Sequence, residues 1–179
     1  MKLYSIAPDL EVRLLEPHDA GDVYTVIEAN REHIRPWLSW AEQNRTEAEV
    51  REFIESAQSG FAERKMLAGG IWKADRFAGG IGCNLDMVNH TASAGYWIAR
   101  EHEGKGVVTR ATDGLVRHLF ATYPLKRVEI RCQKENARSR AVPKRLGFRE
   151  EGILRQALRI GERSVDVVVY AMLREEWRG

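Results

Sequence analysis

Two glycines flank a lysine in the segment whose residue types are best suited to chemistry. Gly104-Lys105-Gly106 lies between an apolar run, Ser93–Ala99, which predicts a strand, and a stretch with the apolar spacing of a helix. Glycines let a backbone turn tightly and let its N–H groups approach an anion without a Cβ in the way. The first turn of the helix adds N–H groups without partners and a partial positive charge. We therefore interpret this turn as a site for a pyrophosphate group.

Two other phosphate-binding motifs fit this turn poorly. A Walker loop requires Gly-x-x-x-x-Gly-Lys-Ser/Thr, whereas Lys105 is followed by Gly106. A dinucleotide-binding fingerprint requires a third glycine, which this segment lacks. A plainer alternative, a turn that only joins a strand to a helix, stays open from this segment alone.

A second segment combines a helix start with a hydroxyl group. Asn136 is suited to cap a helix, which places Ser139 one turn inside it, and Gly147 is suited to end that helix. On its own this pattern is more typical of an ordinary capped helix, with Ser139 as a polar residue near its start. The segment gains a functional meaning only together with the first one.

The elements that position these segments alternate along the chain between strands and helices. Alternating apolar and polar residues predict strands, and apolar residues three and four apart predict helices. The expected order is β-α-α-β-β-β-α-β-α-β-β, with about seven strands. This order predicts a mixed α/β (α+β) sheet with helices on both faces. In chain order, the expected strands and helical stripes are Leu10–Leu15, Ala20–Ile27, Val50–Phe61, Met66–Lys73, Phe77–Leu85, Ser93–Ala99, Val108–Leu119, Arg127–Cys132, Asn136–Leu146, Ile153–Ile160 and Val165–Leu173.

The composition limits the class of protein. At 179 residues, with 44% hydrophobic and 30% charged residues, the chain is expected to form a single domain over residues 1–179. The formal net charge of +2 argues against a nucleic-acid-binding role. No apolar run has the character of a signal peptide or the length of a membrane span. We expect a cytoplasmic protein that binds neither nucleic acid nor membrane.

The side chains that most often bind metals or form disulfides give no motif. Cys83 and Cys132 lie in apolar, strand-like runs and are expected to be buried free thiols. The five histidines show no metal-ligand spacing, so no metal is expected.

Taken together, the two segments resemble the GNAT superfamily of N-acetyltransferases. The acyl-CoA turn of that family is similar to Gly104-Lys105-Gly106, and its later helix is similar to the Asn-x-x-Ser…Lys-x-Leu-Gly-Phe…Glu-Gly pattern of residues 136–152. Gly95-Tyr96-Trp97-Ile98 resembles the family's splayed central strand. The stretch from Asn30 to Trp40 resembles the RimJ/RimL branch, which acetylates the N-termini of ribosomal proteins. The resemblance covers nearly the whole chain.

The resemblance implies direct transfer of an acetyl group from acetyl-CoA to an amine in a ternary complex. A backbone N–H of the splayed strand would polarise the thioester carbonyl, and Ser139 would hydrogen-bond or protonate the leaving sulfur. Asn136 would hold the pantetheine arm, and Lys144 would attract the 3′-phosphate. The other residues assigned to acetyl-CoA come from the strand end, the turn and the start of the next helix: Trp97, Ile98, Ala99, Gly104, Lys105, Gly106, Val107, Val108 and Thr109.

The acceptor side of the site is less defined. His33, Trp37 and Trp40 are the predicted acceptor-binding residues, although two aromatic side chains at this spacing are as typical of a core. The general base stays unassigned among His33, His90 and Glu32, with a water-relayed base as a further alternative.

The resemblance to the RimJ/RimL branch favours a protein N-terminus, such as that of a ribosomal protein, as the acceptor, and it suggests a homodimer. Two alternatives stay open. The first is an acyltransferase for a small amine, such as a polyamine or an antibiotic, and the second is an acyl-CoA-binding sensor without turnover.

Two residues depart from the family pattern. Glu101 stands three positions before Gly104, where a Gln or Arg is common. An acidic side chain does not help to bind a pyrophosphate unless it points to solvent. Pro143 lies where a helix former is usual, so we expect a kink or a missing backbone hydrogen bond there.

Overall fold

The computed structural model describes residues 1–42 and 45–178 of the chain. Short 3₁₀ turns precede α1 (η1, Pro17–Asp19), follow it (η2, Ser39–Glu42) and connect β5 to α3 (η3, Arg100–His102). In chain order, the strands and helices are β1 (Lys2–Ala7), β2 (Leu10–Leu14), α1 (Ala20–Ile34), α2 (Glu47–Ala62), β3 (Met66–Lys73), β4 (Arg76–Asp86), β5 (Thr91–Ile98), α3 (Val107–Thr122), β6 (Arg127–Gln133), α4 (Ala137–Arg145), β7 (Arg149–Ile160) and β8 (Arg163–Leu173).

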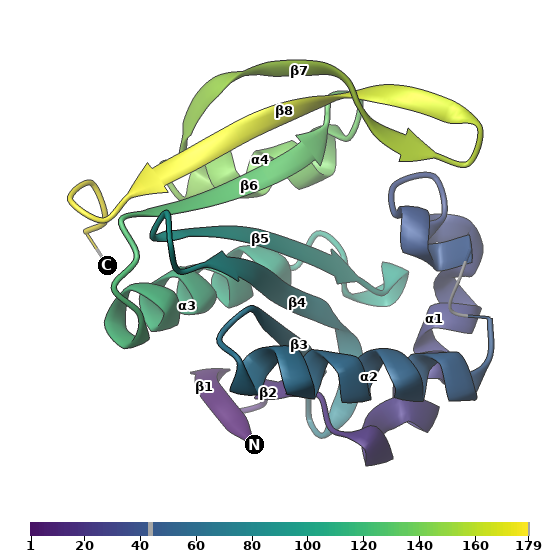
Figure 1. Cartoon of the computed structure of the whole chain (residues 1–179). Helices are drawn as coiled ribbons and strands as arrows, with labels where there is room; N and C mark the ends of the chain where they lie inside the picture. The colour runs from purple at the N-terminus through teal and green to yellow at the C-terminus, as the bar shows by residue number, and fades with distance from the viewer. Residues whose placement is uncertain (43–44, 179) are drawn as a thin grey trace.

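The strands form one mixed sheet in the order β1-β2-β3-β4-β5-β6-β8-β7 (Figure 1). β5 and β6 run parallel, and the other neighbouring pairs are antiparallel. Parallel neighbours need a crossover, and α3 supplies it between β5 and β6. The crossover begins at the Gly104–Gly106 turn, which therefore lies beyond the end of a central strand, where ligands of mixed α/β sheets commonly bind.

The predicted mixed α/β fold with helices on both faces is confirmed, but the predicted number of strands was too low. Within residues 1–42 and 45–178 the sheet has eight strands instead of about seven. The unexpected strand is β1, which lies at the edge of the sheet and pairs irregularly with β2. Its side chains are exposed or half-buried, so no buried face imposes a clear apolar alternation on its sequence.

Apolar side chains attach the helices to both faces of the sheet. On one face Ala111, Leu115 and Leu119 of α3 are fully buried against the strands. On the other face Ile27 of α1 and Ile54 of α2 share a second core with aromatic side chains of β3 and β4. Burial of one leucine or isoleucine side chain contributes about 1.5–3 kcal/mol, so both helical layers give the loops at the sheet's edge a fixed support.

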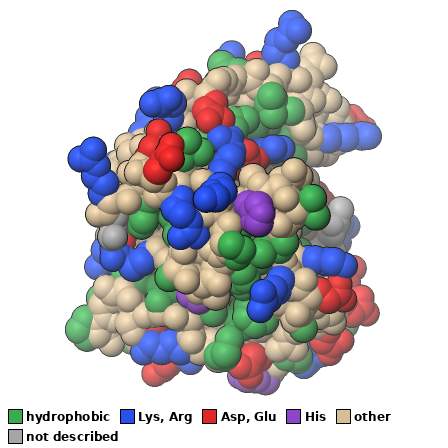
Figure 2. Space-filling view, turned by 60° about the vertical axis from the view of Figure 1, so that its left-hand side comes forward, with side chains coloured by type: hydrophobic (Ala, Val, Ile, Leu, Met, Phe, Trp, Pro, Cys, Tyr) green, Lys and Arg blue, Asp and Glu red, His purple; other side chains and the backbone are tan. Residues whose placement is uncertain are grey.

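The surface shown in Figure 2 carries both signs of charge. Lys and Arg side chains are interspersed there with Asp and Glu, in keeping with the formal net charge of +2. In the part of the chain that the structure describes, no helix is both long enough and apolar enough to cross a membrane.

Candidate active site

The facing edges of β5 and β6 separate halfway along β5. The parallel register runs from Thr91 opposite Arg127 to Ala94 opposite Ile130. Beyond that point β5 continues against β4 as far as Ile98, and β6 continues against β8. Each strand thus stays fixed by its other neighbour while the edges that face each other diverge. Such an edge offers main-chain groups to an extended ligand, which can add to it like a strand.

The end of β5 directs its main-chain groups alternately to its two sides. The Ala99 N–H donates to the Ala78 carbonyl at 2.8 Å, on the β4 side. Successive residues of a strand point their N–H and C=O groups to opposite edges. The main-chain groups of Trp97 therefore also point toward β4, whereas those of Tyr96 and Ile98 point toward the diverging edge. Of the three strand residues predicted to bind acetyl-CoA, Ile98 is therefore the one whose amide is turned toward the separated β6.

The glycine turn holds the backbone in a conformation that other residues rarely adopt. Gly104 has φ +72° and Gly106 has φ +70°, and a Cβ built on either glycine meets no atom within 4 Å. Gly106 precedes the first residue of α3, whose N-terminus has no side-chain cap. The space beside the two glycines is therefore open, and the positive end of the α3 dipole lies next to it. This arrangement is suited to a pyrophosphate.

The side chains of Lys105 and Glu101 contact neighbouring residues of the turn. Lys105 Nζ donates to the Glu101 carbonyl at 2.7 Å, so the lysine ammonium is held by the main chain of its own turn. The Glu101 side chain is 72% exposed and pairs with His102 at 3.1 Å. The acidic departure from the family pattern therefore points to solvent.

The second predicted segment starts α4 beside the end of β6. Asn136 Oδ1 accepts a hydrogen bond from the Ser139 N–H at 3.0 Å, which is the expected cap. The Ser139 hydroxyl lies 3.2 Å from the Cys132 sulfur, and these two atoms share a hydrogen bond. Burial raises the pKa of the Cys132 thiol, so this sulfur stays protonated at neutral pH.

Pro143 removes one helical hydrogen bond of α4, and a side chain from β5 replaces it. A residue at this position would normally donate its N–H to the carbonyl of Ser139, but proline has no N–H. The Tyr96 hydroxyl donates to that carbonyl instead, at 2.9 Å. The helical hydrogen bond expected to be missing is thus absent, and the Ser139 carbonyl that it leaves without a helical donor attaches α4 to the diverging strand.

The segment after α1 covers the ends of β5 and β6 on the opposite face. The Gln133 side chain, at the end of β6, donates to the main-chain carbonyls of Pro36 and Trp37, at 3.2 and 2.9 Å. The Trp40 ring packs edge-on against Trp97 at 5.8 Å between centroids. Trp40 therefore contacts the β5 end, whereas Trp37 is held through its main chain.

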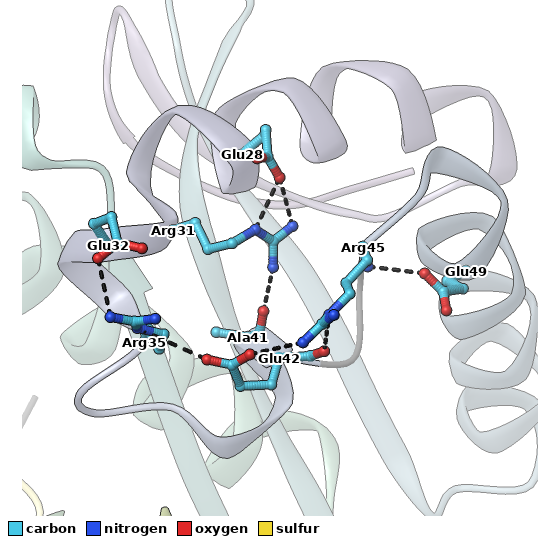
Figure 3. Close-up of polar contacts among 8 residues, drawn as sticks. All are labelled: Glu28, Arg31, Glu32, Arg35, Ala41, Glu42, Arg45 and Glu49. Carbon is cyan, nitrogen blue, oxygen red and sulfur yellow. Dashed lines mark hydrogen bonds and ion pairs between the residues drawn. The ribbon is translucent and has the colours of Figure 1, made fainter. Parts of the chain in front are cut away.

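A network of ion pairs and hydrogen bonds fixes this covering segment (Figure 3). Arg31 of α1 pairs with Glu28 and donates to the Ala41 carbonyl. Glu42 lies near the guanidinium groups of Arg35 and Arg45. Individual exposed pairs contribute about 0–1 kcal/mol, so the order of this segment depends on their joint action and on Gln133.

His33, in the last turn of α1, is joined to the glycine turn. Its Nε2 lies 2.8 Å from Glu103 Oε1, and Glu103 Oε2 lies 2.6 Å from an Arg138 nitrogen at the start of α4. Asn30 on the same helix accepts a hydrogen bond from the Arg100 N–H at 2.9 Å. Three elements that are distant in the sequence thus meet around the carboxylate of Glu103.

Most of the predicted site residues gather around the diverging strands, but Lys144 lies apart from the turn. Its ammonium lies 3.7 Å from Glu150, near the C-terminal end of α4, whereas the N-terminal end of α4 approaches the turn through Arg138. In the described residues no group of three or more His, Cys, Asp or Glu side chains is placed to hold a metal ion.

Sequence reasoning missed the side chains that connect the parts of the site: Tyr96, Glu103, Gln133 and Arg138. Their partners are 35 to 97 positions away in the chain, which no local pattern indicates. Gln133 alone carried a signal, since a polar residue that ends an apolar strand and is buried to 7% exposure needs hydrogen-bond partners.

Comparison with known proteins agrees with this geometry. The model of the acetyltransferase (GNAT) domain family matches residues 9–149. A putative ribosomal N-acetyltransferase of Bacillus subtilis, YdaF, is 38% identical over 172 residues, covering 95% of this chain and 94% of its own. The ribosomal-protein-serine acetyltransferase of Escherichia coli is 29% identical, with 94% of each chain covered.

A solved structure extends the likeness to a complex with the donor. The microcin C7 self-immunity acetyltransferase MccE, in complex with acetyl-CoA and AMP, superimposes with a TM-score of 0.90 at 26% identity, covering 94% of each chain. The family model spans well over half of this sequence, and the YdaF match covers nearly all of it. The chain therefore belongs to the GNAT family of acetyltransferases and is an acyltransferase.

Proposed function

We propose that this enzyme transfers the acetyl group of acetyl-CoA to the α-amine of a protein N-terminus of the ribosomal type, by direct attack in a ternary complex. The observation that carries the proposal is the open glycine turn beside the diverging edges of β5 and β6. The choice of a ribosomal-type acceptor rests on the names of two relatives that align over almost their whole lengths. The enzyme would act in the cytoplasm as a single domain.

The donor would lie along the diverging edge, with its pyrophosphate at the turn. The amides at the start of α3, from Val107 to Thr109, supply the hydrogen bonds, and the glycines keep the approach open. The pantetheine arm would pair with the main chain of Ile98. Since Asn136 uses its Oδ1 as a helix cap, its Nδ2 is the atom we assign to a pantetheine carbonyl.

The chemistry follows from the groups that surround the thioester. The amine nitrogen attacks the thioester carbon, the bond from carbon to nitrogen forms, and the bond from carbon to sulfur breaks. A main-chain amide of the β5 end would stabilise the oxygen that gains negative charge. The Ser139 hydroxyl would donate to the departing sulfur, with Cys132 as its neighbour and with its main chain fixed by Asn136 and Tyr96.

The acceptor would enter from the opposite face of the sheet, under the segment after α1. There the ring of Trp40 lies against Trp97, and Trp37 is fixed through its carbonyl. Fixed aromatic walls hold an acceptor at little cost in conformational entropy. We assign this wall to the first residues of the acceptor chain.

The test is an acetylation assay with acetyl-CoA and peptides that begin with Ser or Ala. Each peptide has a matched control with a formylated N-terminus and an intact lysine, so that modification of a side chain is seen separately. Polyamines and aminoglycosides form the second arm. We expect mass spectrometry to find one acetyl group on the free N-terminus. Acetylation of the small amines alone would refute the peptide acceptor, and absence of thiol release with every amine would refute turnover.

A further inference from the structure

The three side chains considered for the general base have different places in the structure. His90 lies in the turn between β4 and β5, at the opposite end of β5 from the glycine turn. Glu32 is 81% exposed and pairs with Arg35. His33 is 23% exposed and is joined to Glu103, the residue before Gly104. Of these three, His33 alone lies beside the proposed donor site.

The contacts of His33 hold the imidazole through its Nε2 atom. Nε2 faces Glu103 Oε1 at 2.8 Å, and the second oxygen of that carboxylate is held by Arg138 at 2.6 Å. Within residues 1–42 and 45–178, Nδ1 of His33 has no hydrogen-bond partner. A carboxylate that accepts the Nε2 proton leaves Nδ1 as the basic atom. This is the arrangement of a base oriented by a third group.

The position of α1 brings this imidazole to the covered ends of the diverging strands. One turn before His33, Asn30 is bonded to the Arg100 N–H, directly after β5. One turn after His33, the carbonyls of Pro36 and Trp37 are bonded to Gln133 at the end of β6. His33 lies between these two attachments. The acceptor-covering segment and the donor turn therefore meet at this side chain.

We propose that His33 is the general base of the transfer and that Glu103 positions it; this inference rests on the proposed function. An α-amine has a pKa of about 7.7–8.0 and is largely protonated at neutral pH, so it must lose a proton to attack. The ammonium form first gives one proton to solvent, and Nδ1 takes a second proton from the nitrogen as it attacks the thioester carbon. The departing thiolate receives a proton from the Ser139 hydroxyl, which solvent restores. The new imidazolium is stabilised by Glu103 and by the last carbonyls of α1.

The first variant is His33→Ala, with acetyl-CoA affinity measured separately by calorimetry. We expect kcat to fall by about a hundredfold or more while donor affinity is unchanged. Added imidazole should restore part of the activity. His90→Asn, in a turn that asparagine tolerates, is the matched control and should keep full activity.

The second variant is Glu103→Gln, which tests the positioning role. It removes a negative charge beside the proposed pyrophosphate site, so donor affinity should stay equal or rise while kcat falls. A merely structural role of Glu103 predicts that affinity and kcat fall together. Added imidazole should restore part of the activity of His33→Ala but not that of Glu103→Gln.

The outcomes separate this inference from the function on which it rests. Activity of His33→Ala within threefold of the native enzyme, or a large loss that added imidazole does not reverse, overturns the assignment and leaves the function intact. A native enzyme without acetyl transfer to any peptide refutes the function itself.

Discussion

A bulky side chain at Gly106 should abolish donor binding at a small cost in stability. Gly106 has φ +70°, and a Cβ there meets nothing within 4 Å. Gly106→Trp thus requires the left-handed conformation, at a cost of about 1–2 kcal/mol, but its Cβ meets no neighbouring atom. For a chain of this length that cost lowers Tm by about 2–8 °C. The folded protein remains in large excess at 25 °C.

The effect on the donor should be much larger, because the indole would stand where the pyrophosphate approaches the amides. A hydrogen bond to a charged group contributes about 1.5–3 kcal/mol. Loss of two such bonds weakens binding by about 3–6 kcal/mol, which raises Kd about 10²–10⁴-fold.

The control for this variant is Gly161→Trp, in the turn between β7 and β8. Gly161 has φ +57° and the same open surroundings, so its backbone cost is matched while the donor site is untouched. The Kd for CoA is measured by calorimetric titration and the Tm by thermal unfolding, for both variants and the native enzyme. A Gly106→Trp protein that binds CoA like the native enzyme, or two variants that lose affinity equally, would refute the reasoning.

Three other experiments test the role of the Ser139 hydroxyl, the hydrogen bond of Tyr96 and the burial of the two cysteines. Ser139→Ala should lower kcat about a hundredfold with little change in acetyl-CoA affinity, measured by steady-state kinetics and calorimetry; a loss confined to affinity would contradict the role of the hydroxyl. Tyr96→Phe should lower the free energy of unfolding in urea by about 1–3 kcal/mol, because the Ser139 carbonyl loses its donor. In a Pro143→Ala background, whose new N–H at position 143 can bond to the Ser139 carbonyl, Tyr96→Phe should lower the free energy of unfolding by less. Equal losses in the native and the Pro143→Ala backgrounds would contradict this explanation. Burial raises the pKa of Cys83 to about 12 and also raises that of Cys132. Both thiols should therefore resist iodoacetamide at pH 8.5 until the chain is unfolded. The free energy of unfolding should fall as pH rises above about 8.5, because the thiols of the unfolded chain ionise at a lower pH than those of the folded chain. Rapid labelling of either cysteine in the folded protein would contradict their burial.

The sequence was informative wherever function depends on local backbone geometry. The turn at Gly104–Gly106 and the Asn136 cap are short patterns whose conformation is set by the residues themselves. The hairpin of β3 and β4 and the stripe of α3 were likewise readable from local periodicity. The edge strand β1 was not predicted, because its pairing with β2 and not an apolar pattern of its own makes it a strand.

The connections across the site were not readable from the sequence. Glu103 looks like an ordinary polar loop residue, and its role appears only when α1 and α4 converge on it. Tyr96 gains its partner because Pro143 has freed a carbonyl 43 positions away from it. The predicted 3′-phosphate residue Lys144 was chosen for its charge, and the structure gives that charge a partner in Glu150.

A crystal structure of the native enzyme with CoA would show directly whether the donor lies along the diverging edge. We expect the pyrophosphate to accept hydrogen bonds from the amides at the start of α3 and the pantetheine arm to lie against Ile98, between β5 and β6. A pyrophosphate bound elsewhere, or an arm that avoids the diverging edge, would contradict the proposed donor site.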